Sequence, residues 1–292
     1  EDKVGRRAIR LCDLNDHKLL NKKINKLYNF HQVRLKKYNK KVDFNKIFKE
    51  LVVISRYITK FSFPVWKLIN KVGSANKFIL FEGAQGALLD IDFGTYPYVT
   101  SSNTSSGQIF AGSGFGIKKN HRVFGITKAY TTRVGSGPFP TELNDDIADY
   151  LVKKGKEFGT VTKRKRRCGW FDAIIVKQTL KISGVTDIVL TKLDVLDELE
   201  TIKVCVGYKI GKKKYDYLPF DEVLQHKIVP LYKKFNGWKK STYGIKHWKD
   251  LPKKAKEYIL FIEKLISLKI SIISTGPERN QTIDRGKILN KI

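Results

Sequence analysis

The stretch DIVLTKLD at residues 187–194 joins a short β-type run, residues 187–190, to a polar turn that carries a lysine and an aspartate. A second stretch, ISIISTGP at 270–277, has the same layout, with a β-type run at 270–273 followed by small residues. Further β-type runs lie at 78–81, 123–127 and 204–208, and stretches with helical periodicity lie at 143–156, 170–181 and 256–268. This alternation predicts an α/β fold with a mostly parallel central sheet and helices on both faces, related in style to GTP-binding folds.

In such a sheet, ligands bind beyond the carboxyl ends of the strands, so the residues after positions 190 and 273 are candidates for a site. The carboxylate of Asp194 can accept two parallel hydrogen bonds from the N1–H and 2-amino groups of guanine, while the Lys192 stem lies along the base. Adenine lacks that donor pair, and an unmatched buried acceptor costs roughly 1–3 kcal/mol. The turn at 274–276 would close over the same base. The alternative interpretations are a helix cap or surface turn after the first strand and an ordinary tight turn after the second.

The first part of the chain has a different pattern of polar and apolar residues. Residues 13–72 are polar, with apolar positions at helical spacing, which predicts two or three amphipathic helices. These positions are Leu20, Ile24, Leu27, Tyr28, Phe44, Ile47, Phe48 and Leu51. Because no repeat or Pro/Gly/Ser-rich linker interrupts the sequence, we expect a single catalytic α/β domain over 1–292, with a helical subregion at 13–72 and a sheet and nucleotide-binding part at 77–292. Residues 1–7 lead straight into ordered-looking sequence, so we expect the chain to begin inside a larger fold.

The balance of charge is strongly basic: 57 Lys and Arg against 28 Asp and Glu give a formal net charge of +29 over 292 residues. The hydrophobic fraction of 41% excludes wholesale disorder. A polyanion partner is one interpretation, since basic side chains neutralise phosphates without reading sequence. Only 12 of the basic residues are arginine, however, and Asn, Ile, Tyr and Phe are plentiful. This combination favours compositional drift toward A/T-rich codons, ahead of anionic small-molecule substrates and then of nucleic acid.

Three cysteines, Cys12, Cys168 and Cys205, lie far apart and form no C-x-x-C pair, which argues against a disulfide framework and a zinc ribbon. No apolar run approaches the roughly 18 residues of a membrane helix, and the first ten residues are charged where a signal peptide is apolar. The five histidines lack metal-ligand spacing. We therefore expect a cytoplasmic protein with no membrane partner and no metal site in this chain.

Two further segments have sequences suited to binding a ligand. FEGAQGALLDID at 81–92 contains glycines that permit close backbone approach, and Gln85 can pair with a purine edge; the hydroxyl-rich turn around Thr100 suits a phosphate. KRKRR at 163–167 holds three of the twelve arginines, whose guanidinium groups bind phosphate and carboxylate in a bidentate manner. The alternatives are an ordinary polar loop and a solvated or RNA-contacting basic loop. No G-x-x-x-x-G-K-[ST] phosphate loop occurs in the sequence.

Seven motifs taken together resemble the adenylosuccinate synthetase family over nearly the whole chain. They are EDKVGRR at 1–7, FEGAQGALLDID at 81–92, GTYPYVTSSNT at 94–104, RVGSGPFPTEL at 133–143, KRKRRCGW at 163–170, LTKLDVLD at 190–197 and ISTGP at 273–277. The resemblance implies a cytoplasmic, homodimeric ligase of purine and AMP biosynthesis that couples GTP, IMP and L-aspartate to adenylosuccinate, GDP and phosphate with Mg²⁺. In that family the γ-phosphoryl group moves to O6 of IMP, and the amino group of aspartate then displaces the phosphate.

The resemblance also implies a role for individual residues. Lys3 matches the lysine of the family signature and is the catalytic candidate in this chain, and Arg6 matches the arginine that reaches the IMP phosphate of the neighbouring subunit. The implied IMP contacts are Arg6, Gln85, Thr100 and Arg164. The implied aspartate loop comprises Thr160, Val161, Thr162, Lys163, Arg164, Lys165 and Arg166. The implied GTP contacts are Arg166, Lys192, Leu193, Asp194, Ser274, Thr275 and Gly276.

Two departures from the family pattern qualify this interpretation. Val161 and Lys163 stand where we expect threonine and glycine in the aspartate loop. The family's phosphate loop, catalytic aspartate, catalytic histidine and Mg²⁺ ligands are expected upstream of Glu1, so the chain resembles the C-terminal two thirds of the enzyme. The rival hypothesis is a noncatalytic basic remnant of the fold that binds nucleotide or RNA.

Overall fold

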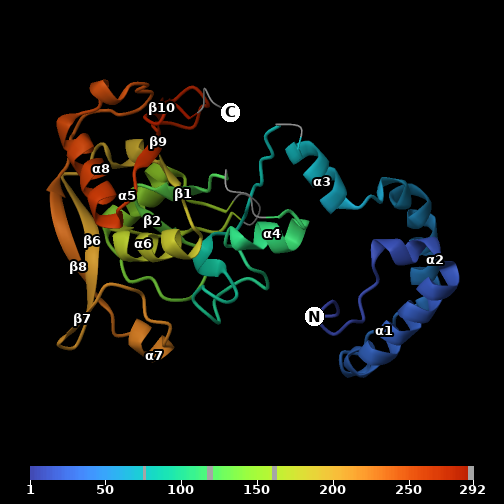
Figure 1. Cartoon of the computed structure of the whole chain (residues 1–292). Helices are drawn as coiled ribbons and strands as arrows, with labels where there is room; N and C mark the ends of the chain where they lie inside the picture. The colour runs from blue at the N-terminus through green and yellow to red at the C-terminus, as the bar shows by residue number, and fades with distance from the viewer. Residues whose placement is uncertain (75–76, 117–120, 160–162, 289–292) are drawn as a thin grey trace. The chain divides into compact units, whose positions relative to one another are not determined.

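A computed structural model describes residues 1–74, 77–116, 121–159 and 163–288 (Figure 1). Contacts within the chain divide it into two compact units, Glu1–Lys77 and Phe78–Ile292. The first unit contains the helical subregion expected at 13–72, and the second unit begins one residue after the start of the part expected at 77–292. The assignment of both parts to one domain stays a prediction, and the two units are described separately.

The first unit is helical. Its elements are η1 (Leu11–Asn15), α1 (His17–Lys37), α2 (Phe44–Ile58), η2 (Thr59–Phe61) and α3 (Val65–Ser74). Asp16 begins α1 by accepting hydrogen bonds from two backbone N–H groups, and Asp43 does the same for α2 with one. The prediction of amphipathic helices is confirmed: Leu20 and Ile24 are buried against Phe44, Phe48 and Leu51. Tyr28 and Ile47, predicted on the same apolar faces, are exposed.

The second unit is built on the predicted mostly parallel sheet. Strands β1 (Phe124–Lys128), β5 (Asp187–Thr191) and β9 (Ile270–Ser274) are parallel, and β10 (Thr282–Asp284) is antiparallel to β9 at the edge. The strand order is β1-β5-β9-β10. Leu190 of β5 pairs with Ile273 of β9, so the turns that follow these two strands lie at the same edge of the sheet.

The run at 204–208 belongs to a different sheet from the one predicted. It is part of β6 (Thr201–Ile210), which is parallel to β4 (Phe171–Asp172) but antiparallel to β7 (Lys213–Tyr215) and β8 (Val229–Asn236). Gly211, at φ 57°, supplies the tight turn between β6 and β7, and such a turn produces an antiparallel hairpin. A small third pair joins β2 (Thr131–Arg133) to β3 (Arg167–Gly169).

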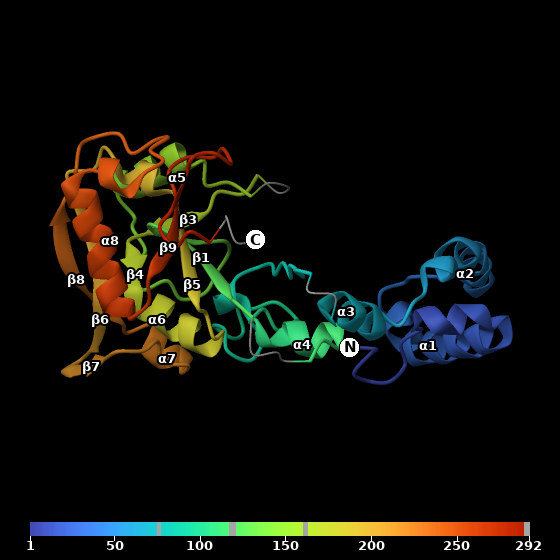
Figure 2. The same ribbon diagram turned by 45° about the horizontal axis from the view of Figure 1, so that its top comes forward.

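The helices of the second unit are α4 (Gly107–Ser113), α5 (Asp146–Gly155), α6 (Ala173–Ile182), α7 (Glu222–Gln225) and α8 (Lys253–Ile266), with η3 (Ala87–Leu89), η4 (Leu193–Leu196) and η5 (Trp248–Asp250). Of these, α5, α6, α8 and η4 bury apolar side chains in one core with the strands. The core combines Leu151 of α5, Tyr258 and Ile262 of α8, and Leu190 and Ile273 of the central sheet. Figure 2 shows α8 beside β8 and β6.

Two further expected elements also differ from the structure. Residues 78–81 form no strand, because Phe78 and Leu80 stay exposed and no other described strand pairs with them. The helix predicted from residue 170 begins at Ala173, because the Asp172 side chain accepts hydrogen bonds from the N–H groups of Ile174 and Ile175 and so sets the first turn. Trp170 instead lies in the core.

Candidate nucleotide site

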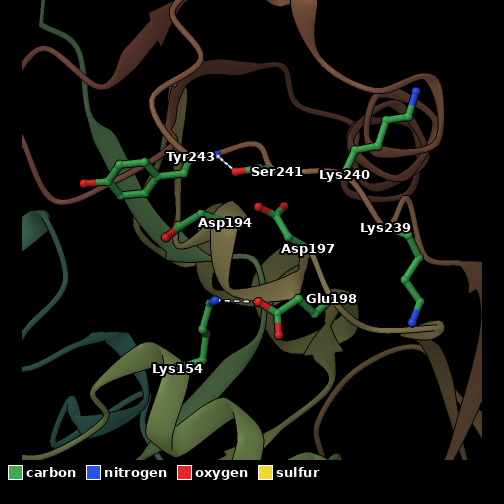
Figure 3. A pocket seen from close by; sticks show the side chains of 8 residues that line it. All are labelled: Lys154, Asp194, Asp197, Glu198, Lys239, Lys240, Ser241 and Tyr243. Atoms are coloured by element: carbon green, nitrogen blue, oxygen red, sulfur yellow. Dashed lines mark hydrogen bonds and ion pairs between the residues drawn. The ribbon is translucent and has the colours of Figure 1, made fainter.

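Asp194, the residue predicted to bind guanine, lines a cavity beyond the carboxyl end of β5. The cavity measures about 470 Å³ and combines residues of α5, of η4 and of the segment before η5 (Figure 3). Its lining residues are Lys154, Asp194, Asp197, Glu198, Lys239, Lys240, Ser241 and Tyr243. The volume is large enough for a purine base and the start of its sugar. Burial raises the pKa of Asp194, and the charge of Asp197 raises it further, while Lys192 and Lys154 oppose both effects.

The second predicted strand end reaches this cavity through one intervening segment. The backbone N–H of Gly244 donates to Thr275 O at 3.2 Å, and Thr275 Oγ1 donates to Ile245 O at 2.8 Å. A Cβ added to Gly276 would lie 3.1 Å from the ring of Tyr243, which lines the cavity. The turns after β5 and β9 are therefore connected through residues 241–245, a segment that the sequence interpretation did not single out.

Asp197 holds that segment against η4. Its carboxylate is buried and accepts hydrogen bonds from Trp238 Nε1 at 2.6 Å, from Thr242 N at 2.7 Å and from Thr242 Oγ1 at 2.8 Å. Burial raises the pKa of Asp197, and the hydrogen bonds from Trp238 and Thr242 counteract part of that rise. Asp197, which itself lines the cavity, therefore fixes the segment at 238–242, and this segment contributes further lining residues.

Other residues predicted for this site are buried or already make hydrogen bonds within the protein. Lys192 has a left-handed backbone at φ 63°, and its Nζ donates to Gly155 O at 2.7 Å. The Leu193 side chain is fully buried, so only its main chain is available to a ligand. Thr275 is also fully buried, and Ser274 Oγ donates to Gly276 O at 2.8 Å, which makes the turn itself rigid.

A buried aspartate organises the predicted purine and phosphate loops. Asp90 accepts hydrogen bonds from the backbone N–H groups of Asp92, Phe93, Thr104 and Ser105. Burial alone would raise its pKa, but these four donors outweigh burial and lower the pKa of Asp90 to about 2. This role could not be predicted from the sequence, because a carboxylate whose partners are backbone groups leaves no pattern of residue types.

Gln85 and Thr100 lie on the two loops that Asp90 connects. Gln85 is exposed, with a left-handed backbone at φ 63°, and precedes Gly86 at φ 128°, a conformation that favours glycine. Thr100 Oγ1 donates to Leu89 O at 3.0 Å, and Thr104 Oγ1 donates to Gly86 O at 2.8 Å. The two predicted residues are therefore carried by one connected pair of loops.

Arg133, at the end of β2, holds the loop that contains Thr100 through hydrogen bonds to Thr95 and Tyr98. It is buried, and its guanidinium donates to Ser136 O, Pro138 O, Tyr98 O and Thr95 Oγ1. Burial lowers the pKa of Arg133, and the nearby charge of Arg167 lowers it further. A buried cation held by carbonyl groups fixes the loop geometry on either side of it.

Carboxylates on neighbouring elements pair with three side chains of the basic segment at 163–167. Arg166 Nη1 donates to Glu157 at 2.8 Å, Lys165 Nζ donates to Asp149 at 2.7 Å, and Arg167 pairs with both oxygens of Glu142. Arg164 is exposed, and Lys163 has a left-handed backbone at φ 53°. The predicted aspartate-loop residues Thr160, Val161 and Thr162 lie outside the described residues.

Lys3 and Arg6 belong to the first unit. Both are exposed, and the N–H of Arg6 donates to Lys3 O at 3.0 Å in a turn with Arg6 at φ 56°. Asp2 steadies this turn from its other side by accepting from Arg7 Nε at 3.1 Å and pairing with His31 Nε2 at 3.0 Å. The proposed roles of Lys3 and Arg6 stay predictions.

Two general properties bear on the site. Among the described residues, no three or more His, Cys, Asp or Glu side chains group as metal ligands. None of the helices in that part of the chain is long and apolar enough to cross a membrane.

Comparison with known proteins gives a consistent result. A family model for adenylosuccinate synthetase matches residues 1–283. The adenylosuccinate synthetases of Wolbachia pipientis from Culex pipiens and of a Wolbachia from Drosophila simulans are each 51% identical over 284 residues. Each match covers 97% of this chain and 66% of the relative, so the chain spans just under two thirds of their length.

A solved structure shows the same fold. The structure of fully ligated adenylosuccinate synthetase from Plasmodium falciparum superposes with a TM-score of 0.88 at 40% identity. The match covers 97% of this chain and 67% of that one.

Proposed function

Because this chain belongs to the adenylosuccinate synthetase family, we propose that it supplies the nucleotide- and substrate-binding part of a GTP-dependent ligase that joins L-aspartate to IMP. The products are adenylosuccinate, GDP and phosphate, in the first committed step from IMP to AMP. The observation that carries the proposal is the cavity at Asp194, built where the turns after β5 and β9 connect.

In this proposal the guanine base of GTP occupies that cavity. The Asp194 carboxylate accepts from N1–H and the 2-amino group, Lys192 lies along the base, and the turn at 274–276 closes the opposite side. The main chain of Leu193 and the guanidinium of Arg166 complete the GTP contacts. The raised pKa of Asp194 is compatible with this role, since two charge-assisted hydrogen bonds from guanine stabilise the ionised form.

IMP and aspartate bind on the other polar loops. Gln85, Thr100 and Arg164 contact IMP, and Arg6 reaches the IMP of the neighbouring subunit of a homodimer. Residues 160–166 bind aspartate. The guanidinium groups of this segment stabilise charge that develops when the γ-phosphoryl group moves to O6 of IMP and when the aspartate amino group displaces phosphate.

The family's Mg²⁺ would neutralise phosphate charge during phosphoryl transfer. The described residues do not group into a set of metal ligands, so no step here is assigned to the ion. A cytoplasmic location stays part of the proposal.

The base preference at Asp194 tests the proposal. Asp194→Asn should weaken GTP use by about 10- to 100-fold and relatively favour xanthosine triphosphate, because the amide can donate to the xanthine 2-oxo group. Adenylosuccinate formation and nucleotide affinity are measured with the chain alone and with the chain joined to the remaining third of a Wolbachia relative. Glu198→Gln is the matched control, because Glu198 lines the same cavity but pairs with Lys154.

An unchanged GTP to XTP ratio in Asp194→Asn would remove Asp194 from the base site. Nucleotide or RNA binding without adenylosuccinate formation in either form of the protein would instead favour a noncatalytic remnant of the fold.

A further inference from the structure

Glu157 is a fully buried carboxylate just after α5, and three donors converge on it. Lys128 Nζ lies 2.8 Å from each of its oxygens, Tyr130 OH donates to Oε1 at 2.6 Å, and Arg166 Nη1 donates to Oε2 at 2.8 Å. Burial alone would raise the pKa of Glu157, but the hydrogen bonds from Lys128 and Tyr130 outweigh it and lower the pKa. The carboxylate is therefore ionised at neutral pH.

The backbone also ties Glu157 to the basic segment. The N–H of Arg166 donates to Glu157 O at 2.9 Å, and the N–H of Gly159 donates to Arg164 O at 2.9 Å. An isolated bridge pairs Phe158 with Lys165 in antiparallel fashion. Residues 157–159 and 163–166 thus run side by side, and Arg166 meets Glu157 through both its backbone and its side chain.

Positive charge exceeds negative charge around this contact. Lys128 ends β1 opposite Thr191, and Lys192 follows β5 and donates to Gly155 O, two residues before Glu157. Burial lowers the pKa of Lys128; Glu157 counteracts this, while Arg166 and Lys192 lower it further. Three cations around one buried carboxylate make a site suited to an anion, which would offset the uncompensated charge.

Glu157 engages only one edge of Arg166. A guanidinium group carries five N–H donors in a fixed fork, and the contact to Glu157 uses Nη1. Because the fork is planar and rigid, holding Nη1 sets the direction of the other N–H groups.

We propose that Glu157 is a positioning residue for nucleotide binding: it holds Arg166 through Nη1 and thereby directs the remaining guanidinium N–H groups toward the anionic part of GTP. The inference rests on the proposed function, which gives Arg166 its role at GTP. Glu157 itself does not touch the nucleotide. Lys128 shares the carboxylate and keeps it ionised.

A double-mutant cycle in the full chain tests this inference. The affinity for GTP is measured by titration calorimetry for the unmodified chain, Glu157→Gln, Arg166→Leu and the double variant. Each single change should weaken GTP binding about tenfold, which corresponds to about 1.4 kcal/mol. The double variant should bind no more weakly than Arg166→Leu, because Glu157 acts through Arg166. A merely structural role would instead make the two losses add.

Glu142→Gln is the matched control. Glu142 pairs with Arg167, the next arginine along the chain, but Arg167 has no proposed substrate contact. The GTP affinity of the Glu142→Gln variant should stay within about twofold of that of the unmodified chain. If Glu157→Gln does not fold, Glu157→Asp replaces it in the cycle, since it keeps the charge but withdraws the carboxylate from Arg166.

The outcomes separate the two proposals. If Arg166→Leu weakens binding but the Glu157 variant does not, or if the two losses add, the positioning role is wrong and the proposed function stands. If Arg166→Leu leaves GTP affinity unchanged, the GTP contact assigned to Arg166 is wrong, and the role of Glu157 fails with it.

Discussion

Asp90 and Asp172 are buried carboxylates whose pKa values shift in opposite directions. Burial opposes ionisation at both positions. At Asp90 four backbone N–H donors overcome that effect, and the pKa falls to about 2. At Asp172 the hydrogen bonds from the Tyr208 hydroxyl and from the N–H groups of Ile174 and Ile175 do not overcome the effect of burial, and the pKa rises to about 6. The two residues should therefore give opposite dependences of stability on pH.

For Asp90, the folded-state pKa lies below the ordinary value of 3.8, so its ionised form stabilises the fold at neutral pH. That stabilisation is lost as the pH falls from about 4 to about 2. Asp90→Asn should lower the free energy of unfolding at pH 7 by about 2 kcal/mol, as measured by urea denaturation. Asp92→Asn is the control, because exposed Asp92 accepts one side-chain hydrogen bond from Asn103. Equal losses in both variants would contradict this role of Asp90.

For Asp172, the folded-state pKa lies above 3.8, so the folded chain binds this proton more tightly than the unfolded chain. Its contribution to stability is fully present below about pH 4 and is lost as the pH rises through about 6. Asp172→Asn should flatten this dependence and leave the chain at least as stable as the unmodified protein at pH 8. Urea denaturation between pH 4 and pH 8 measures both slopes, and an unchanged slope in the variant would disprove the assignment.

At the scale of elements, the sequence predicted best where a strand ends in residues with distinctive chemistry. The turns at 191–194 and 274–276 were predicted to lie together, and the parallel pairing of β5 with β9 brings them to one edge. Short apolar runs were weaker signals, because a strand also needs a partner. Residues 78–81 have no described partner strand, and 204–208 pair in an antiparallel sheet.

The residues that hold these elements in place could not be predicted. Glu157, Asp90 and Asp197 bind partners that are distant in sequence or are backbone groups. Nothing in their local sequence distinguishes them from solvated carboxylates. Their roles become visible only when the chain has folded, and the same is true of the segment at 241–245.

The segment from Trp238 to Thr242 should matter to the cavity through Asp197. Trp238→Phe removes the indole donor and leaves part of a buried carboxylate unmatched, which should cost about 1–3 kcal/mol of unfolding free energy. Because the segment forms the cavity wall, GTP affinity should fall several-fold as well. Thermal unfolding and calorimetric titration measure the two effects. Trp248→Phe is the control, since Trp248 stacks on Arg285 and does not line the cavity; equal losses of GTP affinity would contradict the link.

At the scale of the whole molecule, the net charge of +29 should produce nonspecific attraction to polyanions. Binding of polyuridine should weaken at least about tenfold between 50 and 200 mM salt, because it depends on counterion release. Asp194→Asn should not alter it. Filter binding across a salt series measures the slope, and RNA affinity that persists at 200 mM would favour the RNA-binding alternative.

The parallel pairing of β5 with β9 also has a consequence for biosynthesis. Between these neighbouring strands the chain forms β6, β7, β8 and α8, so β9 and the turn at 274–276 are synthesised well after β5. While a ribosome is still making that stretch, β5 has a nascent neighbour only on its β1 side, and the edge that will accept β9 is open. The emerging polypeptide should therefore be unable to capture GTP and should depend most on chaperones during this interval.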